Sequence, residues 1–242
     1  MSLKSIEIIE NIILFPGTVF NANTDAIVNT VNCMGVMGAG LALEFKLRYP
    51  EMYEDYINKC KKKLVKIGEP YLFIANDGTK IINFPTKYHW RYPSKIEWIK
   101  MGLEYFVQHY KEWNIKSIAF PKLGTNAGKL PWSQVKAVMV EYLKKVDIPV
   151  YICLDELEEA EGIEKEMIRI LNENSIEIIS SIQLRSTMRN YIINQLPIKR
   201  LRYLLNQKQI SNKTYEKLFI ELYNRAKKSQ SNHYENLSFF DR

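Results

Sequence analysis

Short apolar runs alternate with amphipathic segments up to Leu154, and this alternation restricts the folds that are open to the chain. Runs rich in β-branched residues and bounded by turn formers predict strands, whereas apolar residues that recur every three or four positions predict helices. The expected strands are Ile6–Leu14, Ala26–Val31, Tyr71–Ala75, Lys80–Phe84, Ile115–Phe120 and Pro149–Leu154, and the expected helices are Gly38–Arg48, Glu51–Lys63, Pro93–Lys111 and Pro131–Lys145. The pattern predicts an α/β sandwich around a largely parallel central sheet.

Three local signals mark where these elements end. Pro50 separates the first two helices, because proline does not fit inside a helix. The turn former Asn76-Asp77-Gly78 predicts that the strands on either side of it pair as a hairpin. Ser94 is the candidate N-cap of the helix that follows it.

The composition changes after Leu154, where an acidic run, Asp155–Glu161, forms either a connector or the start of an edge helix. Beyond it we expect a helix over Ile163–Asn172 and two or three helices from Ile182, with a break at Pro197. Ser211 opens the last of these helices, and the polar end Ser229–Arg242 is expected to be frayed. We therefore expect two parts, residues 1–160 and residues 161–242.

The positive charge of the chain is concentrated in its last third. The 242 residues carry a net charge of +7, and Ile163–Arg242 holds 14 Lys and Arg against 8 Asp and Glu, or +6. A basic patch of this kind fits nucleic acid or an acidic protein partner. An ordinary solvated helix face is the alternative interpretation.

Cysteine and histidine are too few and too scattered to suggest a metal site or a disulfide framework. These residues are Cys33, Cys60, Cys153, His89, His109 and His233. We expect free thiols, no bound metal and no cofactor. The N-terminus lacks the apolar region of a signal peptide, and no apolar run of about 18 residues occurs, so a cytoplasmic protein without membrane contact is expected.

A glycine loop joins the strand Ala26–Val31 to the next helix. Glycine lets a ligand approach the backbone closely, and successive N–H groups at a helix start attract anions, so the favoured occupant is a phosphate or pyrophosphate. The spacing Gly35-x-x-Gly38-x-Gly40 reverses the order of the dinucleotide-binding fingerprint, and no Gly-Lys-Ser/Thr is present for a P-loop. A tight strand-to-helix turn is the alternative.

A second loop of the same kind runs from Phe120 to Trp132. It also leaves a predicted strand, crosses Gly124 and Gly128, and enters a helix. Ligands of α/β sheets bind at the carboxyl ends of the strands, so the two loops are expected to flank one site. A diphosphate held from both sides, as in a nucleotide sugar, fits this arrangement.

Two asparagines, Asn29 and Asn32, precede the first loop. Their carboxamides can hydrogen-bond a ribose diol or position a water molecule. The alternative is that they are turn formers that cap the loop.

Lys87 ends a predicted strand among aromatic residues, in Thr86-Lys87-Tyr88-His89-Trp90. Partial desolvation by Tyr88 and Trp90 would lower the pKa of the Lys87 amine, which then serves as a nucleophile or a proton shuttle. A lysine that merely extends its stem along an apolar surface is the alternative, and His89 by itself suggests a structural role.

Three stretches together resemble a macrodomain of the DarG type. They are VNTVNCMGVMGAGLALEFKLRYP at Val28–Pro50, NFPTKYHWRYPS at Asn83–Ser94 and FPKLGTNAGKLPW at Phe120–Trp132. The resemblance extends over roughly residues 5–155 and keeps the family order of the motifs. It implies a three-layer α/β/α fold with a mixed, largely parallel sheet that binds ADP-ribose with the diphosphate between two glycine loops.

The resemblance also implies roles for individual residues. Lys87 would be the catalytic lysine, and Asn29, near the distal ribose, would assist it. The implied ADP-ribose-binding residues are Thr18, Asn29, Asn32, Gly35, Val36, Met37, Gly38, Gly40, Leu123, Gly124, Thr125, Asn126, Ala127 and Gly128. The candidates for DNA contact are Tyr88, His89, Trp90 and Arg91.

Two positions depart from the family pattern. The human terminal ADP-ribose glycohydrolase, a relative with a lysine in the same motif, has a catalytic aspartate where this chain has Gly128. Thr18 stands where macrodomains usually carry the acid that reads adenine, so adenine recognition would depend on backbone groups and stacking. The part of the chain beyond Ile163 is also shorter than the toxin-binding half of DarG proteins.

The function implied by the resemblance is that of a DNA ADP-ribosyl glycohydrolase. DarT toxins attach ADP-ribose to thymine in single-stranded DNA, and DarG-type macrodomains remove it. A DarT-like toxin is then an expected partner, in contact with the C-terminal region. Two other functions stay open: a reader that binds ADP-ribose without hydrolysis, and a hydrolase of protein-linked ADP-ribose or O-acetyl-ADP-ribose.

Overall fold

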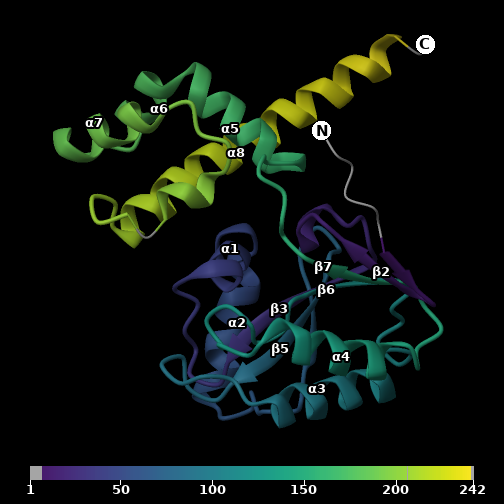
Figure 1. Ribbon diagram of the computed structural model, residues 1–242. Coiled ribbons are helices and arrows are strands. Elements are labelled where there is room, and N and C mark those ends of the chain that lie inside the picture. Colours follow the sequence, from purple (N-terminus) through teal and green to yellow (C-terminus); the bar gives the residue numbers. More distant parts are fainter. Residues whose placement is uncertain (1–6, 206, 241–242) are drawn as a thin grey trace. The chain divides into compact units, whose positions relative to one another are not determined.

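The computed structural model describes residues 7–205 and 207–240, the last ten of them by their backbone alone (Figure 1). The chain divides into two compact units, Met1–Glu156 and Leu157–Arg242. This division falls inside the acidic run, which forms no helix or strand before Gly162. None of the helices in the described residues is long and apolar enough to cross a membrane.

The first unit is built on a seven-stranded sheet in the order β1-β2-β7-β6-β3-β5-β4. The strands are β1 (Glu7–Ile9), β2 (Ile12–Phe15), β3 (Ala26–Asn32), β4 (Tyr71–Ile74), β5 (Lys80–Lys87), β6 (Ile118–Pro121) and β7 (Val150–Cys153). The five strands from β2 to β5 in this order pair in parallel, and the outermost strands β1 and β4 pair antiparallel. The prediction of a mixed, largely parallel sheet is confirmed.

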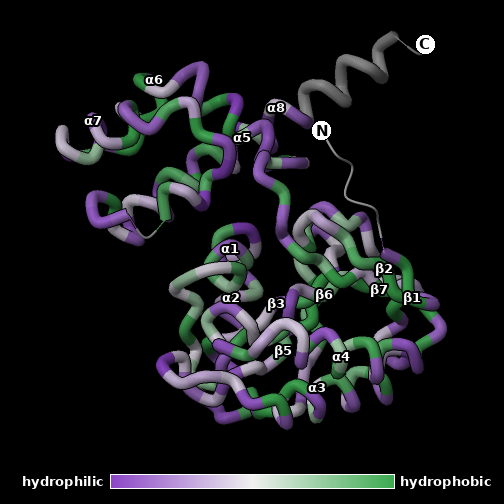
Figure 2. Tube along the Cα trace, viewed as in Figure 1, coloured by the Kyte–Doolittle hydropathy of each residue, from purple (hydrophilic) through white to green (hydrophobic). Residues whose placement is uncertain are grey.

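Helices cover both faces of this sheet, which confirms the three-layer arrangement (Figure 1). They are α1 (Gly40–Arg48) and α2 (Pro50–Lys61) on one face, and α3 (Ile96–His109) and α4 (Trp132–Leu143) on the other, with a short 3-10 helix η1 (Val19–Asn21) after β2. Figure 2 shows that the enclosed strands are mainly hydrophobic. On the α3 side, the rings of Phe84, Phe106 and Phe120 meet edge to face in the core.

The parallel strands bring the sequence motifs to one edge of the sheet. Strand β3 ends at Asn32, where the first glycine loop begins, and its neighbours β5 and β6 end at Lys87 and Pro121. Because neighbouring parallel strands point the same way, both glycine loops and Lys87 lie at the carboxyl edge.

Gly102 lets helix α3 lie directly on strand β5. A Cβ atom at this position would stand 2.3 Å from Cζ of Phe84, which is fully buried. We predict that Gly102→Ala lowers the free energy of unfolding by about 1–3 kcal/mol through overpacking, although alanine favours helices. Urea denaturation measures the change, with the exposed Gln108→Ala on the same helix as a control expected to stay close to wild type. A Gly102→Ala protein as stable as wild type would contradict this account of the contact.

The expected single strand Ile6–Leu14 is wrong, because the chain folds back on itself there. Strands β1 and β2 form an antiparallel hairpin whose turn includes Glu10, with a φ of 54°. The Asn11 side chain supports this turn by donating to the carbonyl oxygens of Leu143, Val146 and Ile148 at 3.0–3.1 Å. Ile6 itself lies outside the described residues.

Ser94 is not the N-cap of helix α3, as the sequence had suggested. The N-cap is Lys95, and no side chain caps the helix. Ser94 is instead buried, and its backbone N–H donates to the carbonyl oxygen of Gly128 at 2.9 Å. It therefore supports the second glycine loop rather than the helix.

The second unit consists of helices packed around α8. They are α5 (Gly162–Glu173), α6 (Ser175–Ser181), α7 (Ser186–Gln195), the 3-10 helix η2 (Leu201–Leu204) and α8 (Asn212–Phe240). The short helix α6 was not expected, whereas the interruption at Pro197 and the start of the last helix after Ser211 were. Fraying from Ser229 is contradicted as far as Phe240, where α8 ends, and residues 241–242 lie outside the described part.

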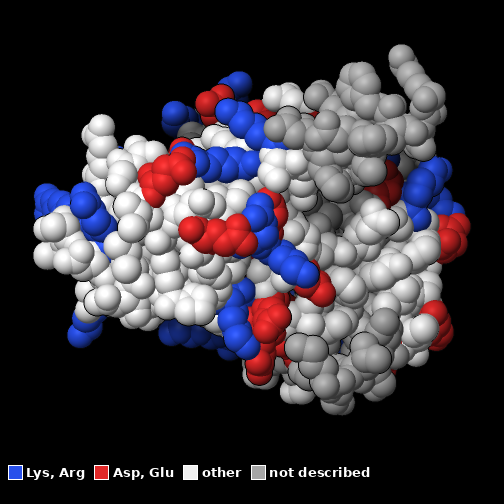
Figure 3. All heavy atoms as spheres, turned by 90° about the horizontal axis from the view of Figure 1, so that it is seen from above, with Lys and Arg blue, Asp and Glu red and all other residues white. Residues whose placement is uncertain are grey.

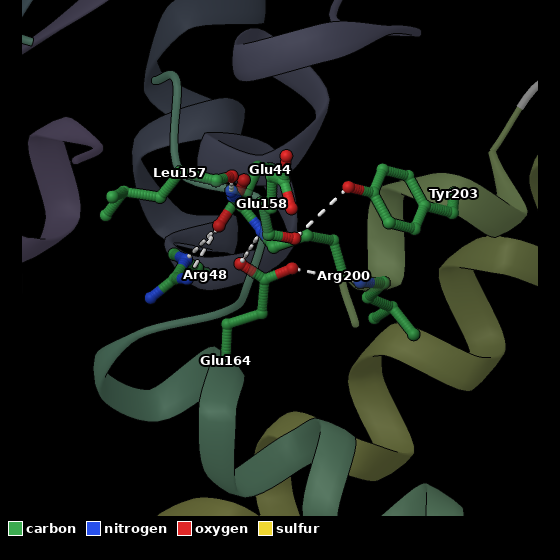
Figure 4. A network of polar contacts seen from close by, with 8 residues as sticks. Glu44, Arg48, Leu157, Glu158, Glu164, Arg200 and Tyr203 are labelled. Carbon is green, nitrogen blue, oxygen red and sulfur yellow. Dashed lines mark hydrogen bonds and ion pairs between the residues drawn. The ribbon is translucent and has the colours of Figure 1, made fainter. Parts of the chain in front are cut away.

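A buried ion pair anchors the start of the second unit (Figure 4). The Arg200 guanidinium donates to Glu164 at 3.0 Å and to the carbonyl oxygen of Leu157 at 2.9 Å. The Tyr203 hydroxyl donates to the carbonyl oxygen of Glu158 at 3.1 Å. These bonds hold residues 157–158 against the helices.

Candidate active site

Lys87 connects the two glycine loops. Its backbone carbonyl accepts a hydrogen bond from the N–H of Cys33, in the first loop, at 3.1 Å. Its Nζ donates to the carbonyl oxygens of Ala127, in the second loop, at 2.9 Å and of Trp90 at 2.6 Å. One lysine is thus held by the first loop, the second loop and the aromatic segment that follows β5.

The surroundings of Lys87 lower the pKa of its amine, so the neutral form is more favoured here than it is in water. Partial burial lowers the pKa of the Lys87 amine, and the positive charge of the neighbouring Lys129 lowers it further. Both the charged and the neutral amine can supply the two N–H groups that the carbonyl oxygens of Ala127 and Trp90 accept. In the neutral form the nitrogen also has a lone pair for attack.

The second glycine loop offers unused backbone donors. None of the N–H groups of residues 125–128 donates a hydrogen bond within the part of the chain that the structure describes. The loop is closed instead by bonds from Leu130 N–H to Gly124 oxygen and from Thr125 Oγ1 to Lys122 oxygen, at 3.1 and 3.0 Å. Successive unpaired N–H groups form a nest that suits a phosphate oxygen.

Gly128 cannot be replaced by a larger residue without moving this loop. A Cβ atom there would lie 2.2 Å from the carbonyl oxygen of Gly124 and 2.4 Å from Oγ of Ser94. An aspartate therefore does not fit at Gly128 in this conformation, which gives a physical reason for the departure from the human relative's pattern. Gly124 is constrained by its backbone conformation instead, with a φ of 65°.

Asn32 shapes the first glycine loop, as the turn-forming interpretation requires. Its Oδ1 accepts from the N–H groups of Met34 and Val36 at 2.9 and 3.4 Å, and its Nδ2 donates to the carbonyl oxygen of Val36 at 2.6 Å. Gly35 and Gly40 have φ values of 79° and 55°, which only glycine adopts readily. The loop is thus preformed by one side chain and two glycines.

In this structure the side chain of Asn29, which the resemblance implied near the distal ribose, is buried. The Asn29 side chain has no exposed surface and donates to Oδ1 of Asn83 on β5 at 2.9 Å. The sulfur atoms of Met37 and Met52 lie 3.9 Å from the same nitrogen. Alternation along β3 turns Asn29 into the layer beneath α1 and α2, so it supports the sheet below the site.

Two other predicted ADP-ribose-binding residues are also buried. The side chains of Met37 and Leu123 are buried in the two core clusters, so only their backbones remain available to a ligand. Val36, Thr125, Asn126 and Ala127 are exposed or half-buried in the loops. Thr18 follows β2 at the same edge, and the two strands β7 and β6 lie between β2 and β3.

An exposed aromatic surface adjoins Lys87. Tyr88 and Trp90 are 62% and 44% exposed, and the His89 ring stacks on Trp90 with centroids 5.6 Å apart. The Arg91 guanidinium lies 4.7 Å from the centre of the Trp90 ring. The predicted DNA-contact residues are therefore gathered into one solvent-facing group.

The sequence interpretation missed three residues of this site. Lys129 affects the pKa of Lys87, Ser94 supports the second loop, and Tyr92 extends the aromatic surface with 65% exposure and a ring contact to His89 at 5.2 Å. The repeated aromatics of Tyr88–Tyr92 were a signal for Tyr92. Nothing in the local sequence indicated the role of Ser94, because its partner Gly128 is distant along the chain.

The sequence of this chain is similar to those of known proteins. The macro domain family model matches residues 28–139. The DNA ADP-ribosyl glycohydrolase of Mycobacterium tuberculosis is 47% identical over 141 residues, which are 56% of this chain and 40% of that protein. A DNA ADP-ribosyl transferase–DNA ADP-ribosyl glycohydrolase fusion protein of Thermosipho africanus is 38% identical over 169 residues, 62% of this chain and 44% of that one.

Two solved structures are similar over the first unit. The macrodomain of Mycobacterium tuberculosis DarG is 45% identical, with a TM-score of 0.54, and the match covers 58% of this chain and 96% of that one. Thermosipho africanus DarTG in complex with ADP-ribose is 39% identical, with a TM-score of 0.59, over 65% and 44% of the two chains. The chain spans about 40% of the length of the curated Mycobacterium relative.

Proposed function

Because the chain belongs to the family of DarG-type macrodomains, we propose that it is a glycohydrolase that releases ADP-ribose from thymine bases of single-stranded DNA. The observation that carries this proposal is the position of Lys87, which is bonded to both glycine loops. A ligand whose diphosphate occupies the nest at residues 125–128 would bring its distal ribose close to this amine. A purely binding module would have no need for a lysine with a lowered pKa at this point.

The proposed reaction begins with attack of the neutral Lys87 amine on C1″ of the ribose. The bond from C1″ to the base nitrogen breaks, and the nitrogen departs with the electron pair and takes up a proton. Water then attacks C1″ of the adduct while Nζ still carries both of its protons. The C1″–Nζ bond breaks with its electron pair returning to Nζ, and the attacking water loses one proton, which gives free ADP-ribose and the neutral amine. Alternatively, a charged Lys87 stabilises the departing base without a covalent bond.

The aromatic group beside Lys87 supports a nucleic-acid substrate. Single-stranded DNA binds to aromatic rings that stack on its bases, and cationic side chains hold its backbone. Tyr88, Trp90 and Arg91 provide rings and a charge within a few residues of the lysine. A single strand also exposes its bases without the cost of flipping them out of a duplex.

The role of antitoxin is part of the same proposal. The Thermosipho africanus relative is named as a fusion of a DNA ADP-ribosyl transferase with the glycohydrolase, which supports a partner enzyme that adds the group this chain removes. A cytoplasmic location is also proposed, and the three unpaired cysteines support it, because thiols stay reduced there.

A direct test incubates the full chain with a single-stranded oligonucleotide that carries ADP-ribose on thymine. Mass spectrometry follows free ADP-ribose and the restored oligonucleotide. Release of both products would support the proposal. If the chain binds ADP-ribose but does not release it from DNA, the chain is a reader. If it consumes only protein-linked ADP-ribose or O-acetyl-ADP-ribose, it hydrolyses one of those linkages and not the bond to thymine.

The pH dependence of this reaction distinguishes the two roles of Lys87. If the neutral amine attacks, the rate rises with pH and levels off above the lowered pKa of Lys87. Lys129→Gln removes a like charge and raises that pKa, so the rising limb is expected to move to higher pH, whereas Lys100→Gln on helix α3 leaves it in place. A rate that falls as pH rises through this region would indicate the charged lysine instead.

A further inference from the structure

The second unit contains a long basic stretch without any acidic residue. Residues 178–215 include seven Lys and Arg and no Asp or Glu. This stretch contains the end of α6, all of α7, η2 and the start of α8. The proposed active site uses none of it.

Two helices here, α6 and α7, are joined by a short turn, as in a helix–turn–helix unit. Helix α6 ends at Ser181, four residues form the turn, and α7 begins at Ser186. Helix α6 packs against α5, α7 and α8, which fixes it in the unit. In DNA-binding units of this kind, the second helix lies in the major groove.

Helix α7 has one apolar face and one polar face. Ile192 is buried, and Met188, one turn earlier, receives a hydrogen bond from Thr214 of α8 at 3.4 Å between Oγ1 and Sδ. The opposite face is exposed and includes Ser186, Asn190 and Asn194. Arg189 is exposed at the edge of the apolar face, and Arg185 stands directly before the helix. Arginine and asparagine are the side chains that pair best with guanine and adenine edges in the major groove.

The charge around this face is positive. Two acidic side chains of the unit, Glu177 on α6 and Glu221 on α8, are both paired with Arg225, at 2.6 and 2.7 Å. Among the residues whose side chains are described, Arg185 and Arg189 form no ion pair. Figure 3 shows basic side chains without acidic neighbours at the left end of the view, where α7 lies.

We propose that α7 is a contact surface for double-stranded DNA. Arg185 and Arg189 bind phosphates, and the exposed polar face of α7 lies in the major groove. This function is separate from the proposed hydrolysis, which acts on a single strand at the first unit. It provides the chain with a means of staying on duplex DNA.

The test measures binding of the full chain to a labelled DNA duplex of about 30 base pairs, three helical turns, by fluorescence anisotropy. The salt concentration is varied from about 50 to about 200 mM, and the matching DNA single strand and RNA duplex serve as competitors. The double variant Arg185→Ala/Arg189→Ala is compared with Lys227→Ala/Lys228→Ala, which removes the same charge from exposed positions on α8.

We expect the α7 variant to bind the duplex about tenfold or more weakly, with a salt slope reduced by about two, one for each lost phosphate contact. The α8 control should stay close to wild type, and the RNA duplex should compete poorly, because its major groove is too narrow for a helix. Circular dichroism checks that both variants are folded.

Three results would overturn the proposal. They are an unchanged duplex affinity of the α7 variant, an equal loss in both variants, and a single strand that binds as tightly as the duplex. A fourth result, absence of duplex binding at low salt, would also overturn the proposal and would point to an acidic protein partner instead. Because the α7 variant should still release ADP-ribose from a short single strand at the wild-type rate, failure here is distinguishable from failure of the proposed hydrolase.

Discussion

Lys87→Ala is expected to lower the rate of ADP-ribose release from modified single-stranded DNA by about a thousandfold or more, because both proposed roles require the amine at this position. The side chain holds no part of the nest at residues 125–128 except through the carbonyl oxygen of Ala127. Affinity for free ADP-ribose should therefore change by only a few fold. Single-turnover kinetics and isothermal titration calorimetry measure the two quantities.

Two further variants make the Lys87 result specific. Lys100→Ala removes an exposed lysine from helix α3 and should leave the rate unchanged. Lys87→Arg keeps a positive charge but provides no neutral nucleophile, because the arginine guanidinium stays protonated. Activity in Lys87→Arg would favour charge stabilisation over attack, and wild-type rates in Lys87→Ala would refute any role for this lysine in the chemistry.

Gly128→Ala is expected to weaken ADP-ribose binding by about 10- to 100-fold. The added Cβ would meet the carbonyl oxygen of Gly124 at 2.2 Å and Oγ of Ser94 at 2.4 Å, so the loop has to open, at a cost of about 1–3 kcal/mol. Opening the loop disturbs the row of unpaired N–H groups and the carbonyl of Ala127 that positions Lys87. Both the affinity for ADP-ribose and the rate of its release from DNA should therefore decrease.

Gly78→Ala is the matched control for this substitution. Gly78 has a φ of 86° in the β4–β5 turn, and a Cβ there meets no atom within 4 Å. Gly78→Ala should lower the free energy of unfolding by about 1 kcal/mol through backbone strain alone, without an effect on ADP-ribose affinity. If Gly128→Ala bound ADP-ribose as tightly as wild type, the second loop would not be the diphosphate site.

The features that sequence patterns predicted well are those that depend on neighbouring residues. The strand Ala26–Val31, the helix break at Pro50 and the hairpin at Asn76-Asp77-Gly78 follow from local preferences, and the structure confirms them. The hairpin at Glu10 was missed because its support comes from carbonyl groups of residues 143–148. Helix α6 was missed because seven residues hold too few repeats to reveal a helical period.

The sequence by itself determined that this chain forms an α/β sandwich with two glycine loops and a strand-end lysine, because hydrophobic periodicity and turn chemistry are local properties. Only the tertiary structure decided which of these residues meet. It joined Lys87 to Ala127 across 40 positions of the chain, turned Asn29 into the interior, and left no room for a side chain at Gly128. Such contacts depend on the register of neighbouring strands and on packing between layers, which no local pattern encodes.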